Sequence, residues 1–147
     1  MARHWLTADA SDSTGKTTIF YDGHCGLCHG FVRFTLAEDR SGAIEFSPLQ
    51  GELFSSSVSE SQRAALPDSI VVRTPDGRLL TRSEAVSFVL ARLGGIWRLV
   101  AVLTGLLPRR LLDACYDAVA RVRLKLFRRP PETCPLVPAE LRSRFRR

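Results

Sequence analysis

The chain has 147 residues, 45% of them hydrophobic, and its 21 basic and 15 acidic side chains give a net charge of +6. This length and composition predict one domain with a substantial hydrophobic core and exclude a disordered chain. The charge is uneven, because residues 121–147 hold nine of the basic side chains and only two acidic ones. The rest of the chain is close to neutral, so its basicity does not indicate a nucleic-acid-binding fold.

Residues 1–16 mix charged and small polar side chains and contain no apolar stretch. They therefore predict a flexible N-terminal extension rather than a signal peptide, and we expect a cytoplasmic protein. The most apolar segment, residues 96–107, is too short for a membrane span of about 20 residues and is predicted to be a buried helix. No transmembrane segment is expected.

The predicted elements begin with a buried strand at residues 17–21, a β-branched and aromatic run. A helix is expected from Cys25 to about Asp39. Three of its apolar side chains recur at offsets of four and seven and share one face: Leu27, Phe31 and Phe34. Residues 43–46 alternate in polarity and predict a second strand.

Two capping-box patterns and a hairpin signal follow. The first box, at residues 59–62, predicts a short helix that ends before Pro67. Two apolar runs flank a Pro-Asp-Gly turn and predict a hairpin over residues 70–80. The second box, at residues 81–84, predicts a helix that ends at Gly94-Gly95.

This order of elements predicts an α/β fold of the thioredoxin-like type, with a mixed central sheet flanked by helices and a C-terminal helical extension. The extension carries an apolar stripe that is expected to pack on the sheet or on the previous helix: Leu111, Cys115, Val119, Val122 and Leu126. The predicted divisions are the N-terminal extension 1–16, the core 17–95, an added helical pair 96–127 packed on the core, and a basic Pro/Arg-rich tail 128–147.

The candidate chemistry lies at Cys25-Gly26-Leu27-Cys28, where a strand leads into a helix start. In a reducing compartment, a close cysteine pair is more often catalytic or metal-binding than structural. A helix N-terminus presents unpaired N–H groups and partial positive charge, which stabilise a thiolate. Because the first cysteine lies nearer that end and is usually the more exposed, we predict that Cys25 attacks and Cys28 resolves the mixed disulfide. Such exchange needs no organic cofactor, but it needs a thiol or disulfide substrate, either a protein or a small molecule, and a reducing partner.

Three polar residues flank the pair. Asp22 could accept a proton from the resolving cysteine, or it could cap the turn before the helix. His24 and His29 could each stabilise a thiolate when protonated, although solvated helix-surface histidines are commoner.

The segment Tyr21-Asp22-Gly23-His24-Cys25-Gly26-Leu27-Cys28 resembles the signature of the DCC-type thiol–disulfide oxidoreductases, named for an Asp followed by two cysteines. The similarity covers nearly everything after residue 16, including Phe31-Val32-Arg33-Phe34, Phe46-Ser47-Pro48-Leu49-Gln50, Asp68-Ser69-Ile70-Val71-Val72, Ser83-Glu84-Ala85-Val86 and the stretch from Tyr116 to Arg123 with Cys134. It implies a thioredoxin-like fold and a redox role for Asp22, Cys25 and Cys28, with no defined substrate. Ser69 stands where thioredoxins carry a cis-proline, so the peptide-docking edge is expected to differ.

Two other functions stay open. The protein could be a binding module whose residues 121–147 make weak contacts with an anionic surface of membrane lipid, RNA or an acidic protein, although a solvated run of charge is the simpler interpretation. The cysteine pair could instead be half of a zinc site, but Cys115 and Cys134 are distant and unpaired in sequence. We expect Cys115 to be buried and inert, and Cys134 to be accessible and able to act as a third redox thiol.

Overall fold

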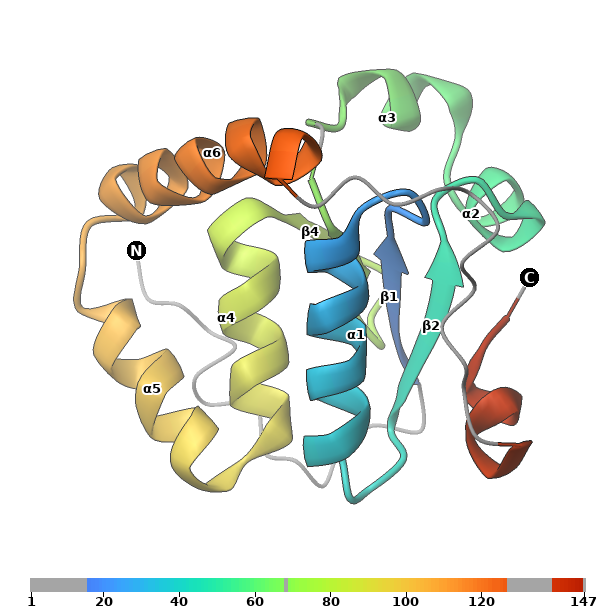
Figure 1. The fold of residues 1–147 in the computed structure, drawn as a ribbon, viewed down its shortest axis with the longest axis horizontal. Coiled ribbons are helices and arrows are strands. Elements are labelled where there is room, and N and C mark those ends of the chain that lie inside the picture. Colours follow the sequence, from blue (N-terminus) through green and yellow to red (C-terminus); the bar gives the residue numbers. More distant parts are fainter. Residues whose placement is uncertain (1–15, 68, 127–138, 147) are drawn as a thin grey trace.

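The computed structural model describes residues 16–67, 69–126 and 139–146 (Figure 1). Its single mixed sheet has the strand order β2-β1-β3-β4, in which β1 pairs in parallel with β2 and antiparallel with β3, and β3 pairs antiparallel with β4. The strands are β1 Thr17–Tyr21, β2 Ile44–Pro48, β3 Val71–Arg73 and β4 Leu79–Thr81.

The helices are α1 Gly26–Glu38, α2 Glu52–Ser57, α3 Glu60–Ala65, α4 Arg82–Leu93, α5 Gly95–Gly105, α6 Arg109–Leu126 and the 3₁₀ helix η2 Ala139–Arg144. The chain forms a parallel β1-α1-β2 unit followed by a β3-β4 hairpin and α4, which confirms the predicted α/β, thioredoxin-like fold. Helices α1 and α4 lie side by side over one face of the sheet (Figure 1). Within the described residues, no helix combines the length and apolar character needed to cross a membrane.

The sheet buries apolar side chains on both faces because successive strand residues point in opposite directions. The larger cluster joins Ile19, Phe46 and Val72 to the inner sides of α1 and α4. The smaller cluster packs Phe20 against Phe54 of α2 on the other face, with ring centroids 4.9 Å apart.

The face of α1 that packs on the sheet is not the apolar face predicted from the sequence. Its buried residues are Cys28, His29, Val32 and Thr35. The predicted apolar face is adjacent to these and only partly covered, because it borders a cavity rather than the core: Leu27, Phe31 and Phe34.

The two capping-box patterns have different outcomes. Ser59 caps α3 as predicted, with its hydroxyl accepting from the Gln62 N–H while the Gln62 side chain accepts from the Ser59 N–H. Thr81 precedes α4 but its side chain caps nothing, so the second predicted box is wrong. The reason is competition, since the Glu84 carboxylate that would complete the box is paired with Arg109 at 2.7 Å.

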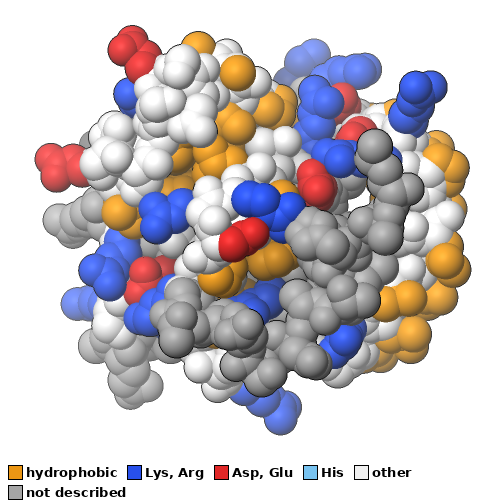
Figure 2. Space-filling model, turned by 180° about the vertical axis from the view of Figure 1, so that it is seen from behind, with side chains coloured by type: hydrophobic (Ala, Val, Ile, Leu, Met, Phe, Trp, Pro, Cys, Tyr) orange, Lys and Arg blue, Asp and Glu red, His pale blue; other side chains and the backbone are white. Residues whose placement is uncertain are grey.

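The prediction of a buried helix at residues 96–107 is also wrong. Helix α5 packs along α4 and buries Ala101, but most of its large apolar side chains are exposed: Ile96, Leu99, Val102 and Leu103. Helix α5 is at the left of Figure 1, and Figure 2, which views the molecule from behind, shows apolar side chains at the corresponding right edge. Trp97 ties α5 to α1, because its indole N–H donates to Glu38 at 2.8 Å and its ring meets Phe34 edge-on at 4.7 Å.

Helix α6 packs through a different face from the predicted one. The whole apolar stripe from Leu111 to Leu126 is exposed, including Cys115, which is therefore neither buried nor packed. Polar contacts decide which face of α6 meets α4, because Ser83 donates to Asp113 and Arg82 pairs with Asp117. Hydrophobic periodicity detected this helix but not its orientation.

The end of the chain lies along β2. Arg146 donates its backbone N–H to the Phe46 carbonyl at 2.8 Å, and Phe145 stacks on the Phe46 ring at 5.3 Å. The Arg144 guanidinium pairs with the buried Asp39 carboxylate. Part of the predicted basic tail is thus held by intramolecular contacts rather than solvated, whereas the extension over 1–15, and Cys134, fall outside the described residues.

Candidate active site

The cysteine pair follows β1 directly and opens α1, as predicted. Cys25 is the N-cap residue of α1, with an extended backbone, and its N–H donates to the Asp22 carbonyl at 3.3 Å. Cys28 lies in the first turn of the helix. Among the described residues, no first-turn amide donates to the Cys25 side chain in the manner of a cap.

The two thiols are free and lie next to each other. Cys25 is 0% exposed and Cys28 is 5% exposed, so the expectation that Cys25 is the more accessible sulfur is wrong. Both sulfurs lie in the main hydrophobic cluster, because α1 is pressed against the end of β1. The pair is therefore a buried dithiol.

Burial is the main cause of an unusual ionisation at Cys28. Removal from water, and then the charge and hydrogen bonding of Cys25, raise the pKa of the Cys28 thiol from 9.0 to about 12. The positive charge of Arg123 and a backbone hydrogen bond from Asp22 act in the opposite direction. At neutral pH Cys28 is consequently a protonated thiol.

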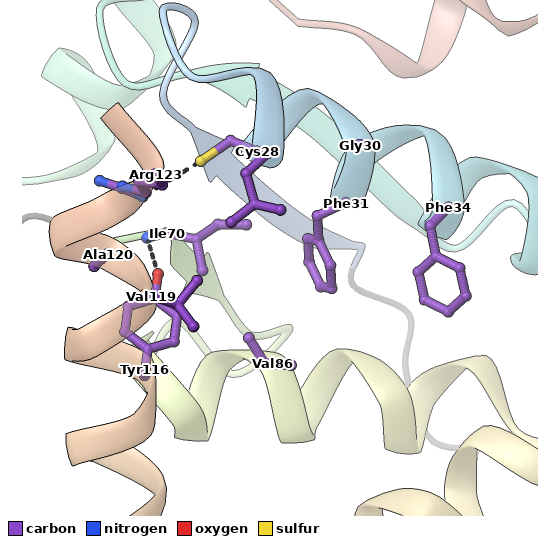
Figure 3. A pocket seen from close by; sticks show the side chains of 11 residues that line it. Cys28, Gly30, Phe31, Phe34, Ile70, Val86, Tyr116, Val119, Ala120 and Arg123 are labelled. Carbon is purple, nitrogen blue, oxygen red and sulfur yellow. Dashed lines mark hydrogen bonds between the residues drawn. The ribbon is translucent and has the colours of Figure 1, made fainter. Parts of the chain in front are cut away.

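Arg123 is the site residue that sequence reasoning missed. It comes from α6, its residue is 3% exposed, and its Nη1 donates to the Cys28 Sγ at 3.4 Å (Figure 3). In the sequence it is one member of a basic run. The available signal is its spacing of seven residues from Tyr116, whose hydroxyl accepts from the Ile70 N–H at 3.0 Å and marks the inner face of α6.

The side chains of Asp22 and Gln50 hold the turn before Cys25 in place. The Asp22 Oδ1 accepts from the His24 N–H at 2.9 Å and from the Gln50 amide at 3.4 Å. Gln50 also accepts from the Gly23 N–H at 3.4 Å. Of the two roles considered for Asp22, these contacts correspond to capping the turn.

The remaining predicted site residues differ in burial and in their contacts. His24 is exposed, whereas His29 is buried, with its Nε2 3.0 Å from the Gly23 carbonyl and its ring edge-on to Tyr21 at 5.6 Å. Ser69 is buried beside Ile70, and its hydroxyl donates to the Ile70 carbonyl at 3.1 Å. Within the described ranges, no three His, Cys, Asp or Glu side chains lie close enough together to hold a metal ion.

A cavity of about 370 Å³ opens beside the dithiol, between α1, α4 and α6 (Figure 3). Its polar groups are the Cys28 sulfur and Arg123 at one end, together with Tyr116. Its walls are otherwise apolar and come from three helices and the residue before β3: Leu27, Phe31, Phe34, Ile70, Val86 and Val119.

Comparison with known proteins agrees with this geometry. Residues 19–129 match the DCC1-like thiol-disulfide oxidoreductase family, a range that includes the cysteine pair and Arg123. The chain belongs to this family. The match confirms the resemblance seen in the sequence around Cys25 and Cys28.

Two relatives of this DCC1-like protein extend over most of its length. It is 34% identical to an uncharacterized protein, YuxK, of Bacillus subtilis (strain 168), over 92% of this chain and 97% of the relative. It is 29% identical to a DCC family protein of Arabidopsis thaliana that is named as chloroplastic, over 90% of this chain and 77% of the relative. No solved structure matches.

Proposed function

We propose that this DCC1-like protein is a thiol–disulfide oxidoreductase in which Cys25 is the nucleophile and Cys28 the resolving thiol. The observation that carries the proposal is the pair of free, neighbouring thiols at the start of α1, with Arg123 against the second sulfur. Cys28 suits the second role, because its raised pKa keeps it protonated until the mixed disulfide has formed.

In the reducing direction the reaction has two exchanges. The Cys25 thiolate attacks one sulfur of the substrate disulfide, forms a mixed disulfide and expels a thiolate, which takes a proton from solvent. Cys28 then attacks the Cys25 sulfur, which forms the Cys25–Cys28 disulfide and releases the second substrate thiolate, and the proton that Cys28 gives up passes through solvent to that thiolate. Two electrons pass to the substrate, and a dithiol partner must return them.

Arg123 has a defined part in this scheme. Its guanidinium is within hydrogen-bond distance of the atom that becomes anionic as Cys28 attacks, and hydrogen bonds to ionised groups are about twice as strong as those between neutral groups. The same contact stabilises Cys28 as the leaving thiolate when the reaction runs in reverse.

Single cysteine substitutions test the assignment in a protein that already carries Cys115→Ser and Cys134→Ser. Cys25→Ser is expected to abolish exchange with a disulfide substrate, and Cys28→Ser is expected to accumulate the mixed disulfide, detected by mass spectrometry after acid quenching. Accumulation of a mixed disulfide on Cys28 in the Cys25→Ser protein would show that the roles are reversed. Exchange at the parental rate in both variants would remove the proposal.

The partners and the setting belong to the same proposal. We infer a cytoplasmic protein whose substrate is a thiol or disulfide and whose oxidised pair is restored by a cellular dithiol. The alternative binding module has less support, because Arg123 contacts Cys28 and Arg144 pairs with Asp39, which leaves fewer of the basic residues free to contact an anionic surface.

A further inference from the structure

The cavity beside Cys28 has an unusual combination of walls. Aromatic and aliphatic side chains form most of its lining, yet one end reaches a sulfur of the reactive pair. Leu27 and Val119 stand at its edge and are 38% and 53% exposed. Binding of an apolar group against such walls is favourable, because it displaces water and removes apolar surface from contact with water.

The cavity lies where the group attached to a substrate sulfur on Cys25 would begin. A substrate sulfur bonded to Cys25 lies about 2.05 Å from the Cys25 Sγ. Since Cys25 is the N-cap residue of α1 and Cys28 lies in its first turn, within the same buried cluster, the group attached to that substrate sulfur begins beside Cys28. Among the described residues, Cys28 is the member of the pair that lines this cavity.

We propose that this cavity is the specificity pocket of the site, and that it holds an aliphatic or aromatic group carried next to the reacting sulfur of a disulfide substrate. The proposal rests on the proposed function, because it names the substrate class for that exchange. Its volume of about 370 Å³ is at the small end of the range for ligand pockets, roughly 300–1,000 Å³, and fits one ring or branched chain with its linker. Glutathione disulfide has no such apolar group and would leave the pocket unfilled.

The apolar group can be carried by a peptide disulfide or by a small-molecule disulfide, and the experiment distinguishes these two kinds of substrate. One is a peptide disulfide whose cysteine is flanked by Phe, compared with the same peptide flanked by Ser. The other is dibenzyl disulfide, compared with glutathione disulfide. In each pair we expect kcat/KM to be at least about ten-fold higher for the apolar member, the discrimination that an apolar pocket typically supplies. Preference within one pair alone identifies the source of the substrate, and preference within neither overturns the proposal.

A matched pair of substitutions on α6 locates the effect. Val119 lines the cavity and Val122 does not, although both are half-exposed valines on the same helix. Val119→Asn is expected to remove most of the preference for the apolar disulfide, whereas Val122→Asn should leave both that preference and the turnover of glutathione disulfide unchanged. Equal effects of the two substitutions would contradict the assignment.

Binding without chemistry separates this inference from the proposed function. A Cys25→Ser/Cys28→Ser protein cannot exchange disulfides, but the apolar walls of its cavity are intact. Titration calorimetry with an S-benzylcysteine peptide should show binding that Val119→Asn weakens about ten-fold and Val122→Asn does not. If the parental protein exchanges no disulfide but the peptide still binds, the proposed enzyme activity is refuted and the pocket stands. If the parental protein exchanges disulfides but the peptide does not bind, the pocket alone is refuted.

Discussion

Arg123 shows how far the meaning of one residue depends on its surroundings. A buried guanidinium is costly unless it is paired, and the partner given by its Nη1 contact is the Cys28 sulfur. A thiol is a weak acceptor and a thiolate is a strong one, so the contact is best satisfied when Cys28 is anionic. The arrangement therefore favours a state that Cys28 reaches only during exchange.

Replacement of Arg123 should slow the resolving step. Hydrogen bonds to charged groups contribute about 1.5–3 kcal/mol, so Arg123→Met is expected to slow attack by Cys28 roughly 10- to 100-fold and to let the mixed disulfide accumulate. Arg123→Lys should recover part of the rate, because it keeps the charge but loses the planar fork. Rapid acid quenching and mass spectrometry measure the lifetime of the mixed disulfide. Arg121→Met, an exposed position on the same helix, is the control and should have the parental lifetime.

The ionisation of Cys28 predicts a second measurable behaviour. In the folded, reduced protein, Cys28 should resist alkylation by iodoacetamide until the pH rises well above 9.0 and approaches 12. Cys25→Ser should move this onset to lower pH, because Cys25 raises the pKa of Cys28, and Arg123→Met should move it higher. Peptide mass spectrometry across a pH series gives the profile. Alkylation of native Cys28 at neutral pH would contradict it.

The same raised pKa has a consequence for stability. Below pH 9.0 Cys28 is protonated in both folded and unfolded protein, so its full contribution to stability is present. Between pH 9.0 and about 12 the unfolded state ionises first, so the free energy of unfolding should fall as pH rises. Urea denaturation of the parental protein and of Cys28→Ala should show a smaller alkaline loss in the variant.

At the scale of elements, two segments with the same capping pattern behave differently, and this limits what local sequence can predict. Residues 59–62 form the box because, in the described part of the chain, the hydrogen bonds of the Ser59 and Gln62 side chains are made within residues 59–62 and not with another element. Residues 81–84 do not, since Ser83 bonds to Asp113 and Glu84 to Arg109 of α6. Tertiary polar contacts have replaced the local ones.

A pair of substitutions measures that difference. Ser59→Ala should lower the free energy of unfolding by about 1 kcal/mol, because it leaves first-turn amides without their acceptor. Thr81→Val keeps the β-branched shape and removes a hydroxyl that caps nothing, so it should change stability by less than about 0.5 kcal/mol. Urea denaturation of both variants provides the test, and a larger loss at Thr81 would show that the second box does form.

For the whole molecule, the strands and helices α1, α3 and α4 were predictable, because strand runs, the Pro-Asp-Gly turn and the double-glycine stop are local signals, whereas α2 was not predicted. The dithiol at the start of α1 was predictable for the same reason. The cavity and the position of Arg123 were not, since they depend on the orientation of α6, which polar anchors to α4 determine against its apolar stripe. The contact of Arg123 with Cys28 joins residues 95 positions apart, and no local pattern encodes it.

The attachment of the chain end is a second contact of this kind, because the pair of Arg144 with Asp39 joins residues 105 positions apart. Asp39 accepts from the Ile44 N–H at 3.0 Å and from the Ser41 hydroxyl at 2.7 Å, and Arg144 supplies the cation that pairs with it. Arg144 also donates to the Ile44 carbonyl at 2.8 Å and 3.0 Å. The outer edge of β2, which is the edge strand beside β1, is therefore covered by residues from near the C-terminal end of the sequence.

Loss of this cation should destabilise the protein as a whole. Arg144→Met leaves the Asp39 carboxylate, 3% exposed, without its ion-pair partner, and we expect it to lower the free energy of unfolding by about 3–5 kcal/mol. Arg146→Met removes a pair with Glu45 whose arginine is 59% exposed, so its cost should be no more than about 1 kcal/mol. Urea denaturation of the full chain compares them, and Asp39→Asn should restore part of the loss in the Arg144→Met background, because no charge is then left unpaired. Equal losses for the two arginines would mean that the ion pair at Asp39 does not secure the chain end, and that the Phe145–Phe46 stacking and the backbone bond from Arg146 hold it instead.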